Sequence, residues 1–552
     1  MTHRHFRECG NLVRNIFVFL FLCAGCKPDS HHSQKTSAEP AYDDSFIESS
    51  IGDASYLNPV LASDSASSSI NGLVFNGLIK YGPQIQLTGD LAEKWEVSKD
   101  GLTLQFYLKK NVLWHDGQPF TAADVQYTFE RLIDPEVKTP YSSNYEKVKK
   151  FEVLDPATIR ITYSEPFVPA LESWGMGILP KHIFQGARGK EFNQHPANKK
   201  PIGTGPYIFK EWKTDEKIIL EANPRYFEGK PHIARYVFRI IPDDAVEFME
   251  LRNKSIDTMV LTPDQYQAYP EFFEGYKKYR FPRAAYTYIG FNLTHPLFKE
   301  KRIREALAYA INKKELVAGV LLGMGISATG PFLPLSWAFD PEVKDFEFNL
   351  NRAKKILKEE GWTDSNQDGI LDKEGKKFEF TLMTNQGNKM RSLTAEIIQD
   401  QLKKVGIKIN IRIIEWSTFI KNFIDRRDFE AIILGWTLSP DPDIYTIWHS
   451  SQIKEGQYNF VSYDNPRVDM LLEAGRKTFN QKEREKIYKE VHRLIHEDIP
   501  YIFLYYPEFL PVVQERFVGP AVVPLSSFGF GWNFDRWFVP KNLVRYPVMA
   551  QE

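Results

Sequence analysis

The stretch "KINIRIIEWSTFIKNFIDRRDFEAIILGW", from Lys408 to Trp436, decides the fold class. "KINIRII" at its start predicts a strand, "STFIKNFIDRR" predicts a helix, and "FEAIILGW" predicts a second strand. The apolar run of this second strand is typical of a strand that is buried on both faces. Strand–helix–strand alternation predicts a parallel or mixed α/β sheet.

The segment that follows, "TLSPDPDIYTIWHSS" (residues 437–451), contains no catalytic motif. It begins just past the C-terminal end of the buried strand. Ligands of open α/β sheets bind at that end of the strands. We therefore expect this segment to lie at a binding site.

Further elements extend outward from this stretch in both directions. Helical spacing of apolar residues predicts helices over residues 391–407 and 301–316. Nearer the N-terminus, "LTLQFYL" (Leu102–Leu108) alternates as a half-buried strand does. In "TAADVQYTFERL", Thr121 is the expected helix N-cap, and Asp124 complements the dipole of the first turn.

The N-terminus has the pattern of a secretory signal over residues 1–25. Basic residues precede a short apolar run, Ile16–Leu22, which is too short to span a bilayer. Ala24-Gly25-Cys26 resembles a bacterial lipoprotein lipobox, which implies lipidation of Cys26. Cys23 stands where that motif has leucine, so an ordinary cleaved signal peptide remains the alternative.

Composition limits the classes of function. All three cysteines lie at or before Cys26, so a mature chain lipidated there has no disulfide. Residues 26–42 have little apolar content and predict a flexible tether. Without residues 1–25 the chain has 67 basic and 70 acidic side chains, a net charge of about −3, which gives no electrostatic footprint for nucleic acid. The 552 residues predict two or three compact units.

Five stretches in order carry a family resemblance. They are "LTGDLAEKWEVSKDGLTLQFYLKKNVLWHDGQPFTAADVQYTFERL" (87–132), "PIGTGPYIFKEW" (201–212), "FNLTHPLFKEKRIREALAYAINKKELV" (291–317), "AKKILKEEGW" (353–362) and "EIIQDQLKKVGIKINI" (396–411). Together they resemble the family-5 extracellular solute-binding proteins of ABC transporters, the oligopeptide- and dipeptide-binding group.

The resemblance implies an α/β protein with the two-lobed periplasmic-binding-protein fold, type II, of the large peptide-binding class. The first lobe is discontinuous in sequence. The expected division is a signal peptide at 1–25, a tether at 26–42, lobe I at 43–283 with a subdomain at about 84–165, lobe II at 284–505, and a C-terminal segment at 506–552 that returns to lobe I.

The resemblance also implies a function without catalysis or cofactor. The protein is expected to be a monomeric substrate-binding component of an ABC importer, outside the cytoplasmic membrane and held there by its lipid anchor alone. It captures di- or oligopeptides between the lobes and delivers them to the permease. The alternatives are another solute (an oligosaccharide, glutathione or a metal complex), an exported hydrolase, or a receptor that presents its ligand to a sensor protein.

The expected ligand contacts begin in the loop after Trp436. The resemblance implies that Trp436 forms a wall of the cleft; the alternative is that it seals the core of its lobe. Peptide binders of the family place an Asp a few residues later to bind the peptide's α-ammonium group, but this chain has Leu438-Ser439 there. Either Asp441 replaces that anchor or the amine contact is absent. For Asp443, a helix N-cap is the simpler interpretation.

Two further sets of residues are candidate ligand contacts. Arg391, with Asn388 in the loop before it, is the candidate partner of a carboxylate at a helix N-terminus; the alternative is a surface arginine without a role in binding. Tyr56 and Asn58, in "DASYLNPV", are expected to line the cleft from the other lobe.

The segment "DSNQDGILDKEG" (364–375) resembles a calcium loop, with candidate ligands Asp364, Asn366 and Asp368. Its twelfth position is Gly375 instead of the expected bidentate Glu. The alternative is a tight solvated hairpin, so the expectation for the protein as a whole is no metal.

Overall fold

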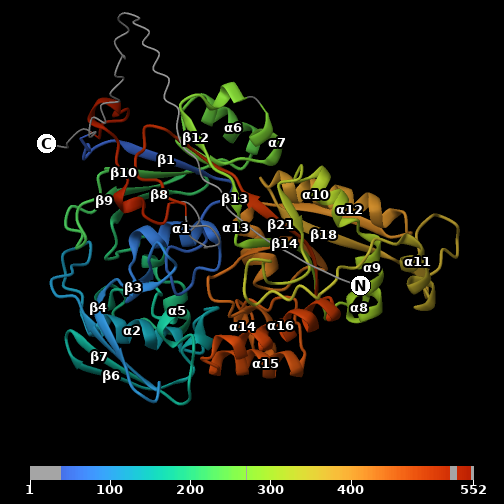
Figure 1. Ribbon diagram of the computed structural model, residues 1–552, viewed down its shortest axis with the longest axis horizontal. Coiled ribbons are helices and arrows are strands. Elements are labelled where there is room, and N and C mark those ends of the chain that lie inside the picture. The colour runs from blue at the N-terminus through green and yellow to red at the C-terminus, as the bar shows by residue number, and fades with distance from the viewer. Residues whose placement is uncertain (1–38, 269, 523–530, 549–552) are drawn as a thin grey trace, which may run out of the picture. The chain divides into compact units, whose positions relative to one another are not determined.

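The computed structural model describes residues 39–268, 270–522 and 531–548. Contacts divide the chain into two units, Met1–Glu39 and Pro40–Glu552, and the second unit carries every described helix and strand (Figure 1). The predicted signal peptide, the lipidation site at Cys26 and most of the predicted tether lie outside the described residues.

The first sheet of the second unit has seven strands in the order β12-β22-β11-β1-β10-β9-β8. Its central strand β1 pairs in parallel with β10 and β11. The strands are β1 (Ser45–Ser50), β8 (Tyr207–Lys213), β9 (Lys217–Ala222), β10 (Arg235–Ile240), β11 (Thr258–Val260), β12 (Tyr276–Lys278) and β22 (Pro511–Gln514). Helices of this part are α1 (Ser65–Val74), α3 (Ala170–Ser173), α4 (Lys181–Phe184), α5 (Gly189–Asn193), α6 (Asp244–Arg252) and α7 (Pro263–Gln267).

A four-stranded antiparallel sheet, β4-β5-β7-β6, forms a subdomain beside the first sheet. Its elements are β4 (Ala92–Val97), β5 (Thr103–Leu108), α2 (Ala122–Leu132), β6 (Val148–Asp155) and β7 (Thr158–Tyr163), and the short hairpin β2 (Ile79–Tyr81) and β3 (Leu87–Gly89) precedes it. The predicted strand at Leu102–Leu108 is confirmed as β5. The predicted N-cap is also confirmed, because Thr121 and Asp124 form a capping box at the start of α2.

The second sheet has the order β13-β21-β14-β20-β18-β19, and β15 pairs with β21. Its strands are β13 (Phe281–Pro282), β14 (Ala285–Phe291), β15 (Gly325–Ser327), β18 (Glu379–Asn385), β19 (Lys408–Ile414), β20 (Ala431–Thr437) and β21 (Tyr501–Phe509). Its helices are α8 (Pro296–Lys299), α9 (Lys301–Ala310), α10 (Lys313–Gly319), α11 (Leu350–Glu359), α12 (Lys389–Lys403), α13 (Trp416–Thr418), α14 (Tyr445–Trp448), α15 (Pro466–Lys477) and α16 (Gln481–Asp498).

The stretch that decides the fold class forms β19 and β20, which both pair in parallel with β18. The mixed α/β sheet is therefore confirmed. The predicted helix between the strands is α13 followed by a π-helix at Phe419–Ile424, a wider winding that helical spacing of apolar residues does not distinguish from an α-helix.

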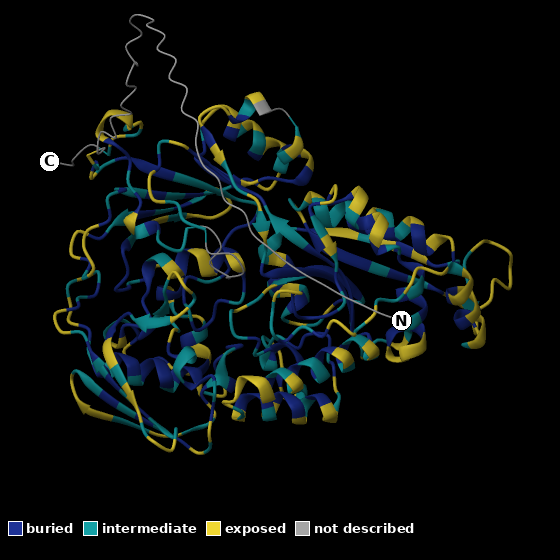
Figure 2. Ribbon diagram, in the orientation of Figure 1, coloured by how far each residue is buried: buried dark blue, intermediate teal, exposed yellow. Residues whose placement is uncertain are grey.

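Strand β20 is buried on both faces, as predicted. Ala431 and Ile433 pack into one apolar cluster, which includes residues of α9 to α12, and Ile432 and Leu434 pack into a second, which includes residues of α14 to α16. The neighbouring strand β14 is buried along its whole length (Figure 2). Helices thus cover both faces of the second sheet, and this gives it a core separate from that of the first sheet.

The chain passes between the two sheets twice. It leaves the first sheet after β12 and enters the second at β13, and it returns between Phe509 and Pro511. We therefore call residues 40–280 together with 511–548 lobe I, and residues 281–510 lobe II. The return lies slightly later than the expected boundary at 505, because β21 stays paired with β13 up to Phe509.

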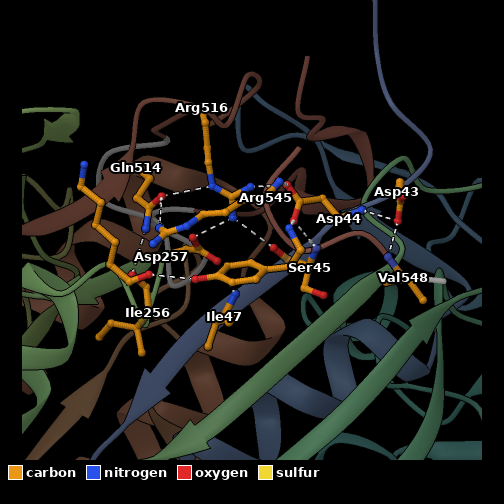
Figure 3. Close-up of polar contacts among 12 residues, drawn as sticks. Asp43, Asp44, Ser45, Ile47, Ile256, Asp257, Gln514, Arg516, Arg545 and Val548 are labelled. Atoms are coloured by element: carbon orange, nitrogen blue, oxygen red, sulfur yellow. Dashed lines mark hydrogen bonds and ion pairs between the residues drawn. The ribbon is translucent and has the colours of Figure 1, made fainter. Parts of the chain in front are cut away.

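The two ends of the folded unit are held together in lobe I by buried charges (Figure 3). Arg516 pairs with the carboxylates of Asp44 and Asp257, neither of which is exposed. The Asp44 carboxylate also accepts hydrogen bonds from the backbone amides of Arg545 (3.0 Å) and Tyr546 (2.9 Å). The C-terminal segment therefore packs where β1 begins.

Candidate functional site

The loop after β20 lies at the boundary between the lobes. β20 runs antiparallel to β14, and the amide of Leu438 donates a hydrogen bond to the carbonyl of Ala284 at 2.7 Å. Ala284 lies four residues after Arg280, the last residue of lobe I before the crossing. Ser439 is exposed in this loop.

Trp436 is half-buried and faces an aromatic group that reaches the other lobe. Its ring stacks on Phe460 and meets Tyr458 edge-on, with centroids 5.8 Å and 5.0 Å away. The hydroxyl of Tyr458 lies 3.1 Å from that of Tyr141 in lobe I. The indole N–H donates to the hydroxyl of Tyr501 at 3.3 Å. Trp436 thus belongs to the lobe II core on one side and to the interlobe surface on the other.

The lobes are in direct contact where β1 ends. A Cβ atom on Gly52 of lobe I would lie 2.5 Å from the Cβ of Trp416 in lobe II. A Cβ on Gly387 of lobe II, whose φ is +79°, would lie 2.9 Å from the Cβ of Ile51. Only glycine allows this close approach, because a side chain at either position would have to displace the facing lobe.

The candidate Asp441 is already paired. Its two carboxylate oxygens accept hydrogen bonds from Arg484 on α16, at 2.8 and 2.9 Å. Arg484 also donates to the carbonyl of Gly475 at 2.9 Å. The charge of Asp441 is therefore balanced within lobe II, and an α-ammonium group would have to share this carboxylate with a guanidinium.

Asp443 holds a second arginine that crosses between the lobes. Its carboxylate accepts from Nε of Arg476 on α15 at 2.9 Å. Arg476 then donates to the carbonyl of Ser143 at 3.2 Å and to Oδ1 of Asn144 at 2.8 Å, both in lobe I. The amide of Val168, also in lobe I, donates to the carbonyl of Arg476 at 2.7 Å. We call Asp443, Arg476, Ser143, Asn144 and Val168 the latch.

The N-cap interpretation of Asp443 is wrong by one residue, because Ile444 is the N-cap of α14 and Asp443 precedes it. Its Oδ1 accepts a hydrogen bond from the amide of Tyr445, the first residue of α14, at 3.2 Å. Asp443 therefore connects Arg476 to the start of α14.

Arg391 and Asn388 lie together at the start of α12. Asn388 is the N-cap, and its Oδ1 accepts from the amide of Arg391 at 3.0 Å. The guanidinium of Arg391 donates to Oδ1 of Asn385 at 2.7 Å and lies over Gly435, where a Cβ would be 3.0 Å from Nη2. Burial lowers the pKa of Arg391. The candidate cation therefore lies beside the C-terminal ends of β18 and β20.

A second half-buried arginine of this part of lobe II, Arg283, was missed by sequence reasoning. It lies between β13 and β14, and its guanidinium carbon is 4.9 Å from the ring centroid of Phe509. Burial, and then the positive charge of Arg391, lower the pKa of Arg283 to about 10. The sequence carries no signal that the charges of the two residues interact, because they are more than a hundred positions apart.

Tyr56 and Asn58 differ in their positions. The ring of Tyr56 faces Lys421 of lobe II, whose Nζ lies 5.2 Å from its centroid. Asn58 is 1% exposed. Its side-chain N–H donates to Oδ1 of Asn198 at 2.8 Å, and its Oδ1 accepts from the backbone amide of Val60 at 2.9 Å. Tyr56 therefore lies at the interlobe surface, whereas Asn58 lies in the interior of lobe I.

The calcium-like loop uses its carboxylates internally. Asp364 accepts from the amides of Asp368 (3.1 Å) and Gly369 (2.9 Å), and Asp368 pairs with Lys377 at 2.5 Å. Within the described residues, no group of three or more His, Cys, Asp or Glu side chains is placed to hold a metal ion. The geometry thus gives the candidate ligands Asp364, Asn366 and Asp368 no support.

Comparison with known proteins shows which family has this architecture. Residues 86–456 match the model of the bacterial extracellular solute-binding proteins, family 5 Middle. The chain belongs to this family. It is 36% identical over 532 residues to the oligopeptide-binding protein AppA of Bacillus subtilis (strain 168), covering 95% of this chain and 97% of that protein.

Solved structures of other proteins agree. The structure of Bacillus subtilis AppA in complex with a nonapeptide has a TM-score of 0.87 at 35% identity, covering 91% of this chain and 100% of that one. NikZ from Campylobacter jejuni, in complex with Ni(L-His), has a TM-score of 0.81 at 30% identity, covering 90% and 99%. DppA from Helicobacter pylori, in complex with the peptide STSA, has a TM-score of 0.80 at 26% identity, covering 91% and 99%. The two-lobed fold is therefore confirmed.

Membership fixes the general role. The family consists of extracellular solute-binding proteins, so its members act by binding, on the outer side of the cytoplasmic membrane. In the part of the chain that the structure describes, no helix combines the length and the apolar character needed to cross a bilayer.

Proposed function

We propose that the protein captures di- or oligopeptides between its two lobes and delivers them to the permease of an ABC importer. The observation that carries this proposal is similarity over nearly the whole chain to an oligopeptide-binding protein whose structure, with a TM-score of 0.87, holds a nonapeptide. The protein acts as a monomer, and a lipid on Cys26 holds it at the membrane surface.

Contacts between the lobes support a capture mechanism in which the solute favours closure. Two exposed ion pairs join the lobes, Lys138 with Glu455 (2.8 Å) and Lys389 with Asp264 (2.9 Å). Exposed pairs of this kind contribute about 0–1 kcal/mol each. These pairs add little to the latch, and a solute that binds both faces shifts the population further toward the closed form. The permease then recognises the two outer faces that closure brings together.

A thermal-shift screen tests the proposal. Protein purified under native conditions and freed of co-purifying solute is melted with peptides of two to nine residues. A peptide that binds only the folded protein stabilises it by about 2.7 kcal/mol at a concentration of one hundred times Kd, so the melting midpoint should rise with peptide concentration. The constituent free amino acids are the control and should give no shift.

Mass spectrometry of the recovered peptide separates binding from hydrolysis. The proposal predicts that the peptide returns intact after prolonged incubation. Peptide cleavage at a rate above that of a buffer blank would establish an exported hydrolase, and the absence of a shift with any peptide would reject peptide capture.

A metal complex is the second candidate solute. It is favoured by the similarity to NikZ, which is in complex with Ni(L-His). Native mass spectrometry of the untreated protein discriminates the two candidates, because a bound nickel–histidine complex and a bound peptide differ in mass and isotope pattern.

A further inference from the structure

One segment of lobe I, residues 138–144, meets lobe II at three successive places. At its start, Lys138 pairs with Glu455 at 2.8 Å. At its middle, the hydroxyl of Tyr141 lies 3.1 Å from that of Tyr458, and the two rings meet edge to face with centroids 6.0 Å apart. Its last two residues belong to the latch. The segment therefore lies along one side of the space between the lobes and contacts lobe II at each step.

The partners of Tyr141 fix the direction of the hydrogen bond between the two hydroxyls. Tyr141 donates to the carbonyl of Ala62 in lobe I at 2.6 Å. A tyrosine hydroxyl has one proton, so Tyr458 must be the donor to the oxygen of Tyr141. Burial raises the pKa of both side chains, and each hydroxyl therefore keeps its proton at neutral pH. We call Tyr141 and Tyr458 the tyrosine bridge, because two consecutive hydrogen bonds run through it from lobe II to Ala62.

Both ends of the tyrosine bridge lie beside surfaces that face the interlobe space. On the side of lobe II, the ring of Tyr458 meets that of Trp436 at 5.0 Å, where β20 ends. Ligands of open α/β sheets bind at that end of the strands. On the side of lobe I, Ala62 lies six residues after Tyr56, whose ring faces Lys421 of lobe II at 5.2 Å. A solute held between these two surfaces would meet the bridge at its edge.

The outer side of the tyrosine bridge is exposed to solvent. Lys138 and Glu455 lie three residues before Tyr141 and Tyr458, and their side chains are 59% and 53% exposed. The two chain segments stay close here, because a Cβ atom on Gly456 would lie 3.6 Å from the Cβ of Lys138. The bridge therefore separates the interlobe space from solvent at this edge, and its rings occupy the path that a longer solute would have to take.

We propose that the tyrosine bridge is an end wall of the solute site and sets the greatest length of peptide that the closed protein accepts, with Tyr458 as the specificity-determining residue. A peptide that extends past the wall must move the ring of Tyr458 and break its hydrogen bond across the lobes. A shorter peptide leaves both in place. The lost hydrogen bond and the lost aromatic contact with Trp436 weaken the binding of longer peptides by about 10–100-fold.

This inference rests on the proposed function, and its test uses two length series of peptides. A peptide that passes the screen described above is extended at its amino end in one series and at its carboxyl end in the other, up to fifteen residues. Each peptide is titrated calorimetrically. In one series, the affinity of the wild type should fall by about 10-fold or more beyond a certain length. Tyr458→Ala, which removes the ring, should bind the next longer peptide within about 3-fold of the shorter one. Tyr458→Phe keeps the ring and should keep the length limit.

Glu455→Gln is the matched control. Glu455 lies three residues from Tyr458 in the same segment, and its substitution removes an exposed ion pair across the lobes without making space in the wall. This variant should keep the wild-type length limit. Tyr141→Ala opens the wall from lobe I and should shift the limit in the same direction as Tyr458→Ala. Melting curves of every variant verify folding.

Three results would overturn the end wall. They are a wild type without a length limit in either series, an unchanged limit in Tyr458→Ala and Tyr141→Ala, and an equal shift of the limit in Glu455→Gln. If no peptide binds at all, the peptide proposal fails, and native mass spectrometry of the co-purifying solutes decides. Solutes of larger mass in Tyr458→Ala than in the wild type would support the wall, and identical masses would reject it.

Discussion

Two pairs of arginines on lobe II have opposite surroundings. Arg476 and Arg484 lie on α15 and α16, each against an aspartate of the loop after β20. Arg283 and Arg391 lie near the crossing strands without a carboxylate among the described residues. The fold therefore balances the charges it uses for its own structure.

The largest expected loss of stability follows when one partner of a balanced ion pair is removed. Asp443→Asn leaves the charge of Arg476, which is 6% exposed at its side chain, without a counter-ion. Removing one partner of a buried pair costs about 3–5 kcal/mol, so the free energy of unfolding from urea titration should fall by about 3 kcal/mol. Asp400→Asn removes an equally charged but exposed partner of Lys404 and should cost less than about 0.5 kcal/mol. Equal losses in the two variants would show that the latch is not a buried pair in solution.

The next effect concerns pH and the carboxyl group that faces the paired arginines from lobe I. Burial, and then the charge of Asp441, raise the pKa of Glu172 to about 7 from an ordinary 4.5, while Arg484 lowers it. The closed form thus binds a proton more tightly than a form in which Glu172 is solvated. Its added stability is complete below pH 4.5 and is lost as the pH rises through 7.

Solute affinity should therefore weaken, by up to about 10-fold, between pH 5 and 7.5. Glu172→Gln should flatten this profile in calorimetric titrations. Glu247 is the matched control: burial also raises its pKa to about 7, but its charged neighbours Glu48 and Asp244 lie in lobe I. Glu247→Gln should change the pH dependence of unfolding and leave that of binding as in the wild type. A wild-type slope that survives Glu172→Gln would contradict the cross-lobe assignment.

A smaller effect tests the unbalanced arginines by stability alone. Arg283→Met removes a charge that has no partner, so the free energy of unfolding without solute should change by less than about 1 kcal/mol. Arg476→Met, the same substitution at a balanced site, leaves Asp443 unpaired and should cost about 3 kcal/mol. The comparison fails if the two variants unfold at the same urea concentration.

The smallest effect concerns the calcium-like loop, whose carboxylates already have partners within the protein, like those that pair with Arg476 and Arg484. Asp364 and Asp368 already bond to their own loop and to Lys377. Adding millimolar calcium should move the melting midpoint by less than about 1 °C, and Asp368→Asn should cost less than about 1 kcal/mol. A calcium-dependent rise of several degrees that Asp368→Asn removes would establish a metal site.

Elements that depend on local patterns could be predicted from the sequence. Each of these patterns is complete within a few neighbouring residues. Examples are the alternation of "LTLQFYL", the apolar run of "FEAIILGW" and the capping box of Thr121. The π-helix at Phe419–Ile424 could not be predicted, because its spacing also fits an ordinary helix.

The partners of charged side chains could not be predicted in the same way. Asp441 is a candidate amine anchor by its position in the chain, but its partner Arg484 lies 43 residues later on another element. Candidate sites of this kind become visible only when the fold shows which charges are balanced.

The most direct test of the central claim is a crystal structure of the closed protein with its solute. The account predicts a peptide between the two lobes, while Arg476 and Arg484 keep their pairs with Asp443 and Asp441. A closed complex whose solute lies outside the space between the lobes, or in which either arginine has lost its aspartate, would contradict it.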